Sequence, residues 1–424
     1  MSLRRLVLAA AIIVVAAIGT MAVQTAATLP SEISDAEFWR MIVEFSEQGG
    51  SYPYENFVSN ELTVQHVIPA LKATTKPGGV FIGVGPDQNF TYVSALQSKL
   101  AFVVDIRRQN MLEMLMYKAL FELSPDRLDF VSRLFSRVRP ALLDSRASAS
   151  ALFATYEKAK PDAELYQKNL QAIKASMTQH GFALSSEDLG KLEYVYQVFY
   201  KGGPAINYEF MSTSPFTGAA SYSQLMNITD TAGRNWGFLA NEENYQYVRE
   251  MQRRNMIVPL VGDFAGPAAL RNIGRYLKER NAVVTAFYAS NVEYYLNPTQ
   301  KQAFYANLTE LPGDPSSMLV RYILGSQARN LSWWKQEMDD VSAISPMSEI
   351  TNIVRAGQRP VFEDLLRATK DPIVLAGQGQ GTQIYVLKGS AAPAGYTLTG
   401  TAKQTIQTVN GTSATVDVDV YSRK

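Results

Sequence analysis

The chain has 424 residues, no cysteine and only two histidines, and this composition excludes several kinds of chemistry. A disulfide framework, a thiolate nucleophile and an iron–sulfur cluster all require cysteine, and two histidines cannot build a multi-histidine metal centre. The 40 Lys and Arg residues against 39 Asp and Glu leave a formal net charge of +1, without the basic surplus of nucleic-acid-binding proteins. We therefore expect no metal site and no nucleic-acid partner.

The first 27 residues are expected to direct export. Arg4 and Arg5 precede an apolar run from Leu6 to Val23, and small residues follow as far as Ala27. A basic start, an apolar core and a small-residue exit are typical of a secretory signal peptide. The run is also close to the length that spans a bilayer, so an uncleaved anchor in the inner membrane is the alternative. Either way, we expect a periplasmic or secreted body that touches a membrane only through this segment.

A helical cap is predicted over residues 28–76. Ser34 and Glu37 form a capping-box pattern, and a buried apolar stripe follows at Phe38, Met41, Ile42 and Phe45. The Tyr- and Asn-rich stretch Ser51–Asn60 is predicted to be a loop before a second helix over Glu61–Ala73.

Residues 77–123 carry the first half of an α/β domain. Val80–Ile82 and Ala101–Asp105 are predicted to be buried strands, separated by a glycine-rich turn and a helix. A further helix is expected over Gln109–Glu122. Strand, helix, strand and helix in this order are typical of an open parallel sheet.

A helical insert is predicted over residues 124–240. Helices are expected from Ser124 to about Tyr200, with starts near Ser124-Pro125, Pro161 and Ser185. Gly203–Ala240 is predicted to be a long loop, and we regard it as a candidate lid.

The second half of the α/β domain is expected over residues 241–390. Its predicted strands are Ile257–Val261, Ala282–Tyr288 and Met318–Ile323. The predicted helices begin at Gly266-Pro267 and near Trp333–Met338, Glu349–Arg355 and Val361–Thr369. Pro372–Ala376 and Thr382–Leu387 are predicted to form a hairpin, and residues 391–424 a Thr- and Val-rich hairpin extension turning at Asn410-Gly411.

These elements predict a doubly wound, mostly parallel Rossmann-like α/β sheet with a helical insert and a C-terminal antiparallel hairpin. In such a sheet, ligands bind beyond the carboxyl ends of the strands. We expect the site where the loops Gly83–Phe90, Asp105–Arg108, Asp263–Gly266 and Asn291–Tyr294 converge.

The pair Gly83 and Gly85, with Asp105 at the end of the next strand, has the logic of a nucleoside site. Glycines allow a tight turn and a close approach of the backbone to a ligand, and an acid at the second strand end can bind a ribose diol. The third glycine of the dinucleotide pattern is absent, with Gln88 or Asn89 near its place. A nucleoside without a diphosphate, such as S-adenosylmethionine, does not need that glycine. The alternative is an ordinary strand-to-helix turn.

The order of elements and these motifs resemble class I S-adenosylmethionine-dependent methyltransferases. The stretches GVGPDQNFTYV, VDIRRQN and LMYKALFEL are also similar to an uncharacterised group of bacterial methyltransferase-like proteins. The resemblance implies a cofactor site made by Gly83, Gly85, Asp87, Asp105, Asp263 and Asn291. The fourth predicted strand is followed by Asn291 and Tyr294 without the two prolines of the amine-methylating motif, so Asn291, Glu293 and Tyr294 are only candidate catalytic residues.

Several other polar residues have a functional and a structural interpretation. Arg107 and Arg108 could meet an anionic ligand or simply open a helix as solvated charges. The arginines of the insert are expected to form the polar face of one helix, at positions Arg127, Arg133, Arg137 and Arg139. His66, His180 and the pair Trp333-Trp334 are expected to be structural.

Two functions from different classes fit the sequence. The first is an exported S-adenosylmethionine-dependent methyltransferase that acts on an unknown small-molecule acceptor. The second is an exported protein that keeps the same scaffold and binds a ligand or partner without catalysis. Export favours the second, since the cofactor is made in the cytoplasm, and the motifs favour the first.

Overall fold

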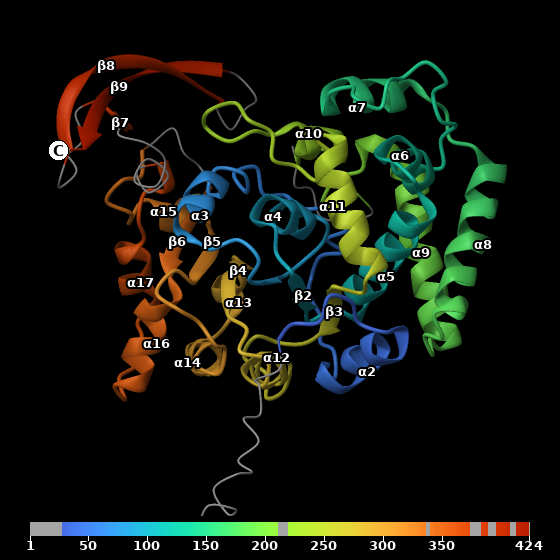
Figure 1. Cartoon of the computed structure of the whole chain (residues 1–424), viewed down its shortest axis with the longest axis horizontal. Helices are drawn as coiled ribbons and strands as arrows, with labels where there is room; N and C mark the ends of the chain where they lie inside the picture. The colour runs from blue at the N-terminus through green and yellow to red at the C-terminus, as the bar shows by residue number, and fades with distance from the viewer. Residues whose placement is uncertain are drawn as a thin grey trace, which may run out of the picture.

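The computed structural model (Figure 1) describes residues 28–210, 219–335, 340–373, 383–388, 396–407 and 413–423. The predicted signal segment, residues 1–27, lies outside this part of the chain. Within the described ranges, no helix combines the length and the apolar character needed to cross a bilayer.

A six-stranded, mostly parallel sheet forms the centre of the molecule, with strand order β3-β2-β1-β4-β5-β6. Its strands are β1 (Val80–Gly83), β2 (Leu100–Asp105), β3 (Ile257–Val261), β4 (Val284–Ser290), β5 (Met318–Ile323) and β6 (Val341–Pro346). Strands β1 to β5 run parallel, and β6 pairs with β5 in the antiparallel direction. The predicted strands β1 to β5 are confirmed to within a residue or two, whereas β6 was not predicted.

Strand β1 lies in the middle of the sheet and sets the position of the site. Ile82 is in register with Phe102 of β2 on one side and with Phe287 of β4 on the other. Because the chain leaves β1 first toward β2 and returns later to β4, the strand order reverses between β1 and β4. Because β1 to β5 run parallel, their carboxyl ends all lie at one edge of the sheet.

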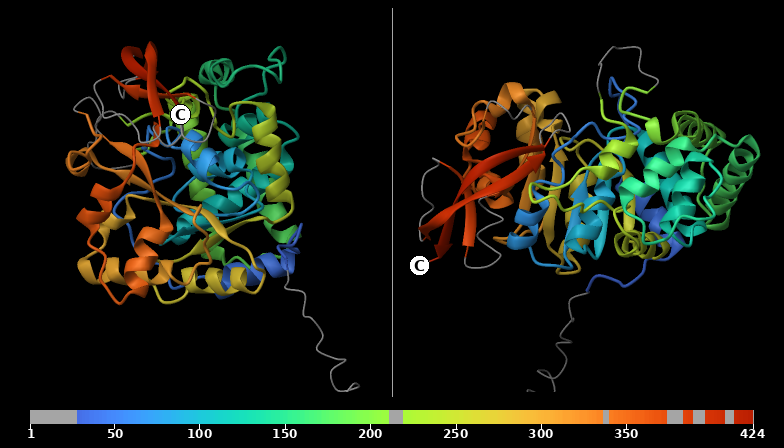
Figure 2. Two further views of the ribbon diagram at one scale, coloured as in Figure 1. Left: turned by 60° about the vertical axis from the view of Figure 1, so that its left-hand side comes forward. Right: turned by 90° about the horizontal axis from the view of Figure 1, so that it is seen from above.

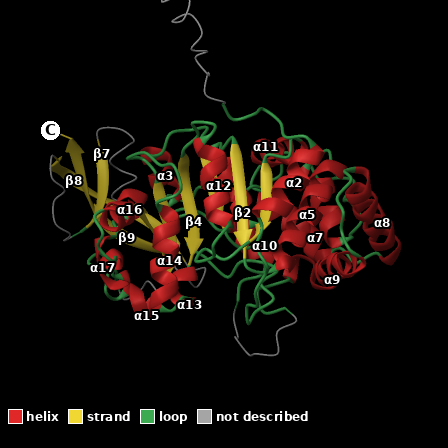
Figure 3. Ribbon diagram, turned by 90° about the horizontal axis from the view of Figure 1, so that it is seen from below, coloured by secondary structure: helices red, strands yellow, loops and turns green. Residues whose placement is uncertain are grey.

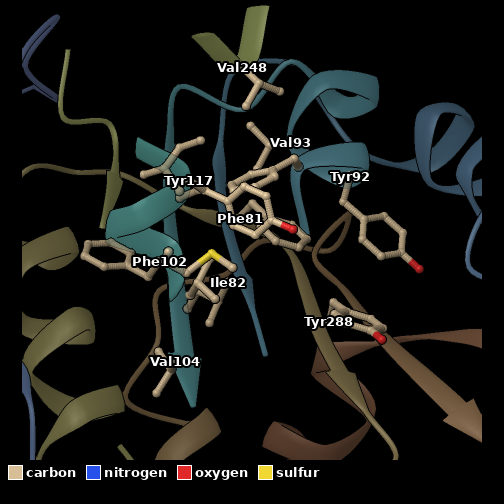
Figure 4. Packing of buried hydrophobic residues seen from close by; sticks show 14 of the residues in the cluster. Phe81, Ile82, Tyr92, Val93, Phe102, Val104, Tyr117, Val248 and Tyr288 are labelled. Carbon is tan, nitrogen blue, oxygen red and sulfur yellow. The ribbon is translucent and has the colours of Figure 1, made fainter. Parts of the chain in front are cut away.

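Aromatic side chains fill the core against this central strand (Figure 4). The rings of Phe81 and Tyr92 lie 5.7 Å apart between centroids, and those of Tyr92 and Tyr288 lie 5.1 Å apart. All three side chains are fully buried. Burial of each large side chain contributes roughly 1.5–3 kcal/mol, so this packing fixes β1 and β4 firmly next to each other.

Helices cover both faces of the sheet (Figures 1 and 3). One layer holds α3 (Ile68–Thr74), α4 (Gln88–Leu96), α5 (Arg108–Leu123) and α11 (Glu242–Arg253). The other holds α2 (Asp35–Phe45), α12 (Ala269–Lys278), α14 (Pro298–Leu308) and α16 (Met347–Arg355). The shorter helices are α13 (Val292–Tyr295), α15 (Gly325–Ala328) and α17 (Phe362–Ala368).

The first helix shows how local sequence sets the ends of these elements. The Ser34 hydroxyl accepts a hydrogen bond from the Glu37 amide, as the N-cap prediction requires. The reciprocal arm of the capping box was predicted wrongly, because the Glu37 carboxylate pairs with Arg40 at 2.6 Å. The stripe from Phe38 to Phe45 is buried as predicted.

The helical insert between β2 and β3 is confirmed and lies beside one end of the sheet (Figure 2). Its elements are α6 (Arg127–Phe135), α7 (Ala149–Lys158), α8 (Ala163–Gln179), α9 (Ser186–Gly202), the 3₁₀ turn η1 (Gly203–Ala205) and α10 (Tyr222–Asn227). Helix α5 packs against β2 and β3 on one side and against α8, α9 and α11 on the other. The insert therefore shares one continuous core with the sheet.

The lid prediction for Gly203–Ala240 is wrong for most of the described part of this stretch. Tyr222 and Phe238 are fully buried, and α10 lies within the stretch. The aromatic side chains of this segment account for its packing, because burying such large side chains is strongly favourable.

A separate antiparallel sheet with strand order β7-β9-β8 ends the chain. Its strands are β7 (Gln383–Leu387), β8 (Tyr396–Gln407) and β9 (Ser413–Arg423). The β8–β9 hairpin confirms the predicted extension, although its turn at Asn410-Gly411 lies outside the described residues. The other hairpin was predicted wrongly, because β7 pairs with β9 and Pro372 and Ile373 are helical. The helix predicted over Trp333–Met338 is not found at residues 333–335, which form a turn and irregular chain, and residues 336–338 lie outside the described ranges.

Candidate functional site

A pocket of about 290 Å³ lies at the carboxyl edge of the sheet, where the strand order reverses. Each of the four expected loops contributes to its wall: Val84 and Gly85 after β1, Asp105, Ile106 and Arg107 after β2, Gly262, Asp263 and Phe264 after β3, and Ser290, Asn291 and Val292 after β4. Parallel strands that end at one edge bring such loops together, as expected from the sequence.

The cap supplies a further part of the wall, which the sequence did not indicate. Six residues from Ser51 to Glu61 line the pocket, and residues from other elements complete it: Gln88, Val104, Tyr208, Tyr295, Leu296 and Gln300. The Ser51–Asn60 stretch was correctly predicted to be a loop. Its position over the pocket was not predicted.

The two glycines of the first loop have different roles. Gly85 lines the pocket and has a φ of +78°, a backbone conformation that favours glycine. At Gly83, an added Cβ would collide with the side chain of Asn89. The Asn89 amide lies inside the loop and donates to the carbonyls of Val84 and Pro86 at 3.0 and 2.7 Å. Gly83 therefore makes room for Asn89, and Gly85 is the glycine that a ligand could approach.

Asp87 faces the protein interior and is not among the residues that line the pocket. Burial raises the pKa of its carboxyl to about 7, against the opposing effect of a hydrogen bond from Tyr222. The carboxyl of Glu113 in α5 lies close enough to Asp87 for the two charges to repel each other. Burial raises the pKa of Glu113 well above its usual value. The geometry does not support the expected cofactor contact at Asp87.

Asp105 lines the pocket, but both of its carboxylate oxygens are held by Arg107. Arg107 Nε lies 3.0 Å from Asp105 Oδ1, and Nη2 lies 2.9 Å from Oδ2. The Arg107 amide also donates to Oδ1 at 2.8 Å. Both side chains are more than nine-tenths buried, so the interpretation of Arg107 as a solvated charge is wrong. Asp105 could bind a ribose diol only through its remaining lone pairs or after Arg107 moves.

Asp263 and Asn291 remain accessible in the pocket wall. Both are half-buried. One oxygen of Asp263 accepts a hydrogen bond from the Ala265 amide at 2.8 Å, and the Asn291 amide oxygen accepts from the Ser290 hydroxyl at 3.3 Å. These two residues fit the predicted role of ligand contacts.

Glu293 and Tyr294 point away from this pocket and line a smaller neighbouring depression. Glu293 forms a buried ion pair with Arg321, with Nε 2.5 Å from Oε2, and accepts a hydrogen bond from Tyr305 at 2.8 Å. Tyr294 is 53% exposed. Because both Glu293 oxygens are engaged by Arg321 and Tyr305 and the side chain lies outside the pocket, the geometry does not support Glu293 as a general base.

Glu61 is the acid in the pocket that the sequence did not single out. It is 4% exposed and lies at the end of the cap loop. Its oxygens accept hydrogen bonds from the Tyr288 hydroxyl at 2.5 Å and from the Ser290 hydroxyl. Burial raises the pKa of the Glu61 carboxyl to about 7, although both hydrogen bonds oppose the shift. A carboxyl that titrates near neutral pH in a pocket is a candidate functional group.

Tyrosines form one wall of the pocket. Tyr52 contacts Tyr295 edge to face with centroids 5.2 Å apart, and its hydroxyl lies 3.4 Å from that of Tyr208. The Arg107 guanidinium lies 5.8 Å from the centre of the Tyr52 ring. Such a wall could stack against a flat ring or face a cation.

The space beside Asp105 is open. Phe90 and Tyr288, the side chains most able to fill it, do not line the pocket. Phe90 instead packs in the core against Tyr117 and Phe238, with centroids 5.4 Å away in each case. A small molecule can therefore occupy the site without displacing the core.

The remaining candidates have structural roles. Arg108 pairs with Asp188 at 2.7 Å. The prediction of one polar arginine face is wrong, because Arg127 and Arg137 are buried, and Arg127 donates to the Leu239 carbonyl at 2.9 Å. Arg127 also pairs with Glu242 at 3.7 Å, and the more exposed Arg133 and Arg139 pair with Asp129 and Asp126. Throughout the described ranges, no three His, Asp or Glu side chains come together as a metal site.

The chain matches one known protein family, described as a domain of unknown function (DUF7790), over residues 56–203 and 205–345. The chain belongs to this family. The match includes strands β1 to β4 and every pocket-lining residue except Ser51 and Tyr52. No curated protein is significantly similar to the chain.

Proposed function

We propose that this member of the DUF7790 family is a Rossmann-like, doubly wound protein that binds S-adenosylmethionine in the pocket and transfers its methyl group to a small-molecule acceptor. One observation carries the proposal. The pocket lies at the carboxyl ends of β1 to β4, at the point where the strand order β3-β2-β1-β4-β5 reverses. In open α/β sheets this crevice is the usual ligand site, and dinucleotides and nucleosides are its common occupants.

The character of the wall supports a nucleoside without phosphates. Gly85 lets the ligand approach the backbone, and Asp263 and Asn291 offer polar contacts. Arg107, the one arginine among the described residues of the wall, is neutralised by Asp105 and does not offer a free cation to a phosphate. S-adenosylmethionine has a nucleoside, a sulfonium and an amino acid group but no phosphate, and so matches this wall.

The chain's own contribution to methyl transfer would be positioning. The bound cofactor supplies an electrophilic methyl group, and the protein must hold an acceptor in line with it while excluding water. The cap loop from Ser51 to Glu61 covers the pocket and would provide this exclusion. Glu61 is placed to take a proton from an acceptor hydroxyl or amine.

Calorimetric titration of the purified protein with S-adenosylmethionine and S-adenosylhomocysteine tests the proposal. We expect micromolar binding that is lost in Asn60→Trp, which places an indole at the pocket mouth from an exposed position. Gln358→Trp, at an exposed position outside the pocket lining, is the matched control and should bind as the wild type does. Absence of binding at millimolar ligand would refute the proposal.

A second candidate is a non-catalytic, exported ligand-binding protein on the same scaffold. The Asp105–Arg107 pair favours this alternative, because the residue expected to bind the ribose is already engaged. The predicted signal segment favours it too. This protein would bind a small polar molecule in the same pocket and would release it unchanged, so a methyl-transfer assay separates the two candidates.

A further inference from the structure

Among the described residues, Glu61 is the buried acid of the pocket wall that lacks a cationic partner; Asp87 and Glu113 are also buried without an ion pair, but they do not line the pocket. Asp105 is paired with Arg107, and Glu293 is paired with Arg321. Within the described part of the chain, Glu61 has no lysine, arginine or histidine at ion-pair distance, and its hydrogen-bond donors are the neutral hydroxyls of Tyr288 and Ser290.

The surroundings of Glu61 do not compensate a negative charge. The nearby Asp340 carboxylate repels the charge of Glu61 and so helps to raise the pKa of Glu61. The Glu61 charge in turn helps to raise the pKa of three buried tyrosines, Tyr92, Tyr288 and Tyr322. The Gln88 side-chain amide, which is neutral, donates to the Tyr288 hydroxyl at 3.4 Å, and this hydroxyl in turn donates to Glu61. A buried and uncompensated carboxylate is costly, and the cost falls when a cation arrives.

The geometry of the carboxyl group leaves it able to receive a ligand. Each oxygen accepts one hydrogen bond from the β4 strand end and can accept another. The residue lines the same pocket as the tyrosines Tyr52, Tyr208 and Tyr295. Aromatic faces together with a carboxylate are the usual means of binding an organic cation.

We infer that Glu61 and this tyrosine wall select a ligand that carries an onium charge, a sulfonium or a quaternary ammonium, over its neutral analogue. The inference rests on the proposed function where the ligand is S-adenosylmethionine, and it extends that function by assigning the cation site to a residue of the cap loop. A purely structural alternative is that Glu61 only fastens the cap loop to β4 through its two hydrogen bonds.

The test compares S-adenosylmethionine with S-adenosylhomocysteine, which lacks the sulfonium charge, by calorimetry at pH 5.5, 6.5 and 7.5. Because a cation binds the ionised form of Glu61, the preference for the charged ligand should rise as the pH passes upward toward about 7, the pKa to which burial raises the carboxyl. We expect the ratio of the two Kd values to change by about tenfold, which corresponds to ~1.4 kcal/mol. Glu61→Gln should remove both the preference and its pH dependence.

Glu293→Gln is the matched control, because it alters a buried acid that lies outside this pocket, and it should keep the wild-type preference. If both nucleosides bind with a constant ratio, or if Glu61→Gln retains the preference, Glu61 only fastens the loop and the inference fails. Choline, an onium ion without a nucleoside, separates this failure from failure of the proposed function. One outcome is that choline binds while neither nucleoside does, and that Glu61→Gln abolishes this binding. This result would support the cation site and refute S-adenosylmethionine as the ligand. If none of the three binds, both fall.

Discussion

Arg107 holds both carboxylate oxygens of Asp105, at 3.0 and 2.9 Å, in the wall of the pocket. Asp105 stands where the methyltransferase resemblance implies a ribose-binding acid. This chain departs from that pattern because its acid is already engaged by an arginine. A ligand must either bind beside the pair or replace one of its contacts.

The neighbouring arginines should differ strongly in their effect on stability. Arg107→Ala leaves the buried Asp105 carboxylate without its cationic partner, with the amide of residue 107 as a remaining donor, and should lower the free energy of unfolding by ~3–5 kcal/mol. Arg108→Ala removes an ion pair in which the arginine side chain is 45% exposed and Asp188 is 6% exposed, and should cost about 1–2 kcal/mol, because Asp188 keeps its hydrogen bond from the Ser185 amide. Urea denaturation of the two variants measures the difference. Equal losses would show that the Asp105–Arg107 pair is not the buried contact described above.

Glu61→Gln should stabilise the protein at alkaline pH. The folded-state pKa of Glu61 is raised to about 7, so its contribution to stability is fully present below its ordinary pKa of 4.5 and is lost as the pH rises toward 7. At pH 8 the variant should exceed the wild type by up to about 3 kcal/mol, and the difference should shrink toward pH 5. Denaturant unfolding at several pH values measures it. A difference that is independent of pH would contradict the raised pKa.

Glu293→Gln should destabilise the fold without weakening ligand binding. The change leaves Arg321 buried without its carboxylate partner, which should cost ~3–5 kcal/mol. Because Glu293 lies outside the pocket, the Kd for S-adenosylmethionine should stay within about twofold of the wild type, a change of ~0.4 kcal/mol. Thermal unfolding and calorimetry give the two values. A large loss of binding in a folded variant would restore Glu293 as a site residue.

His180 should make the stability depend on pH near neutrality. Its ring lies 2.7 Å from Glu122 and 2.9 Å from Asp35, joining α5, α8 and the cap helix α2. The hydrogen bond with Glu122 is the main cause that raises the pKa of His180 above 6.5. The stabilisation is therefore fully present below pH 6.5 and is lost as the pH rises through the higher folded-state value.

Stability curves between pH 6.5 and 8.5 should show this loss, of less than about 1 kcal/mol for a partly exposed pair. His180→Asn should reduce the slope of the curve by this amount, while the larger loss due to the Glu61 carboxyl remains. His66→Gln is the control, because burial lowers the pKa of His66 to about 4 and keeps the ring neutral over this range. A wild-type slope in His180→Asn would contradict the assignment.

The sequence predicted the central sheet and the location of the site for one physical reason. Strands buried on both faces must be continuous apolar runs, and the runs around Val80, Ala101 and Ile257 are of this kind. Parallel strands end at a common edge, so the loops after them were expected to meet. Strand β6 escaped prediction because the run VSAISP is short, contains two serines and ends on proline, so it lacks the continuous apolar character of the other strands.

The chemistry within the site depended on contacts that no local pattern specifies. Glu61 meets Tyr288 across 227 residues of chain, and only the packing of the cap loop on β4 brings them together. Asp105 and Arg107 were both noticed in the sequence. Their pairing follows from burial, since two charges that lose water at the same place are strongly favoured as an ion pair.

A crystal structure of the protein grown with S-adenosylhomocysteine tests the central claim most directly. We predict a nucleoside in the pocket between Gly85, Asp263 and Asn291, with the cap loop lying over it. Crystals grown at saturating ligand with an empty pocket, or with the nucleoside bound elsewhere on the molecule, would contradict it.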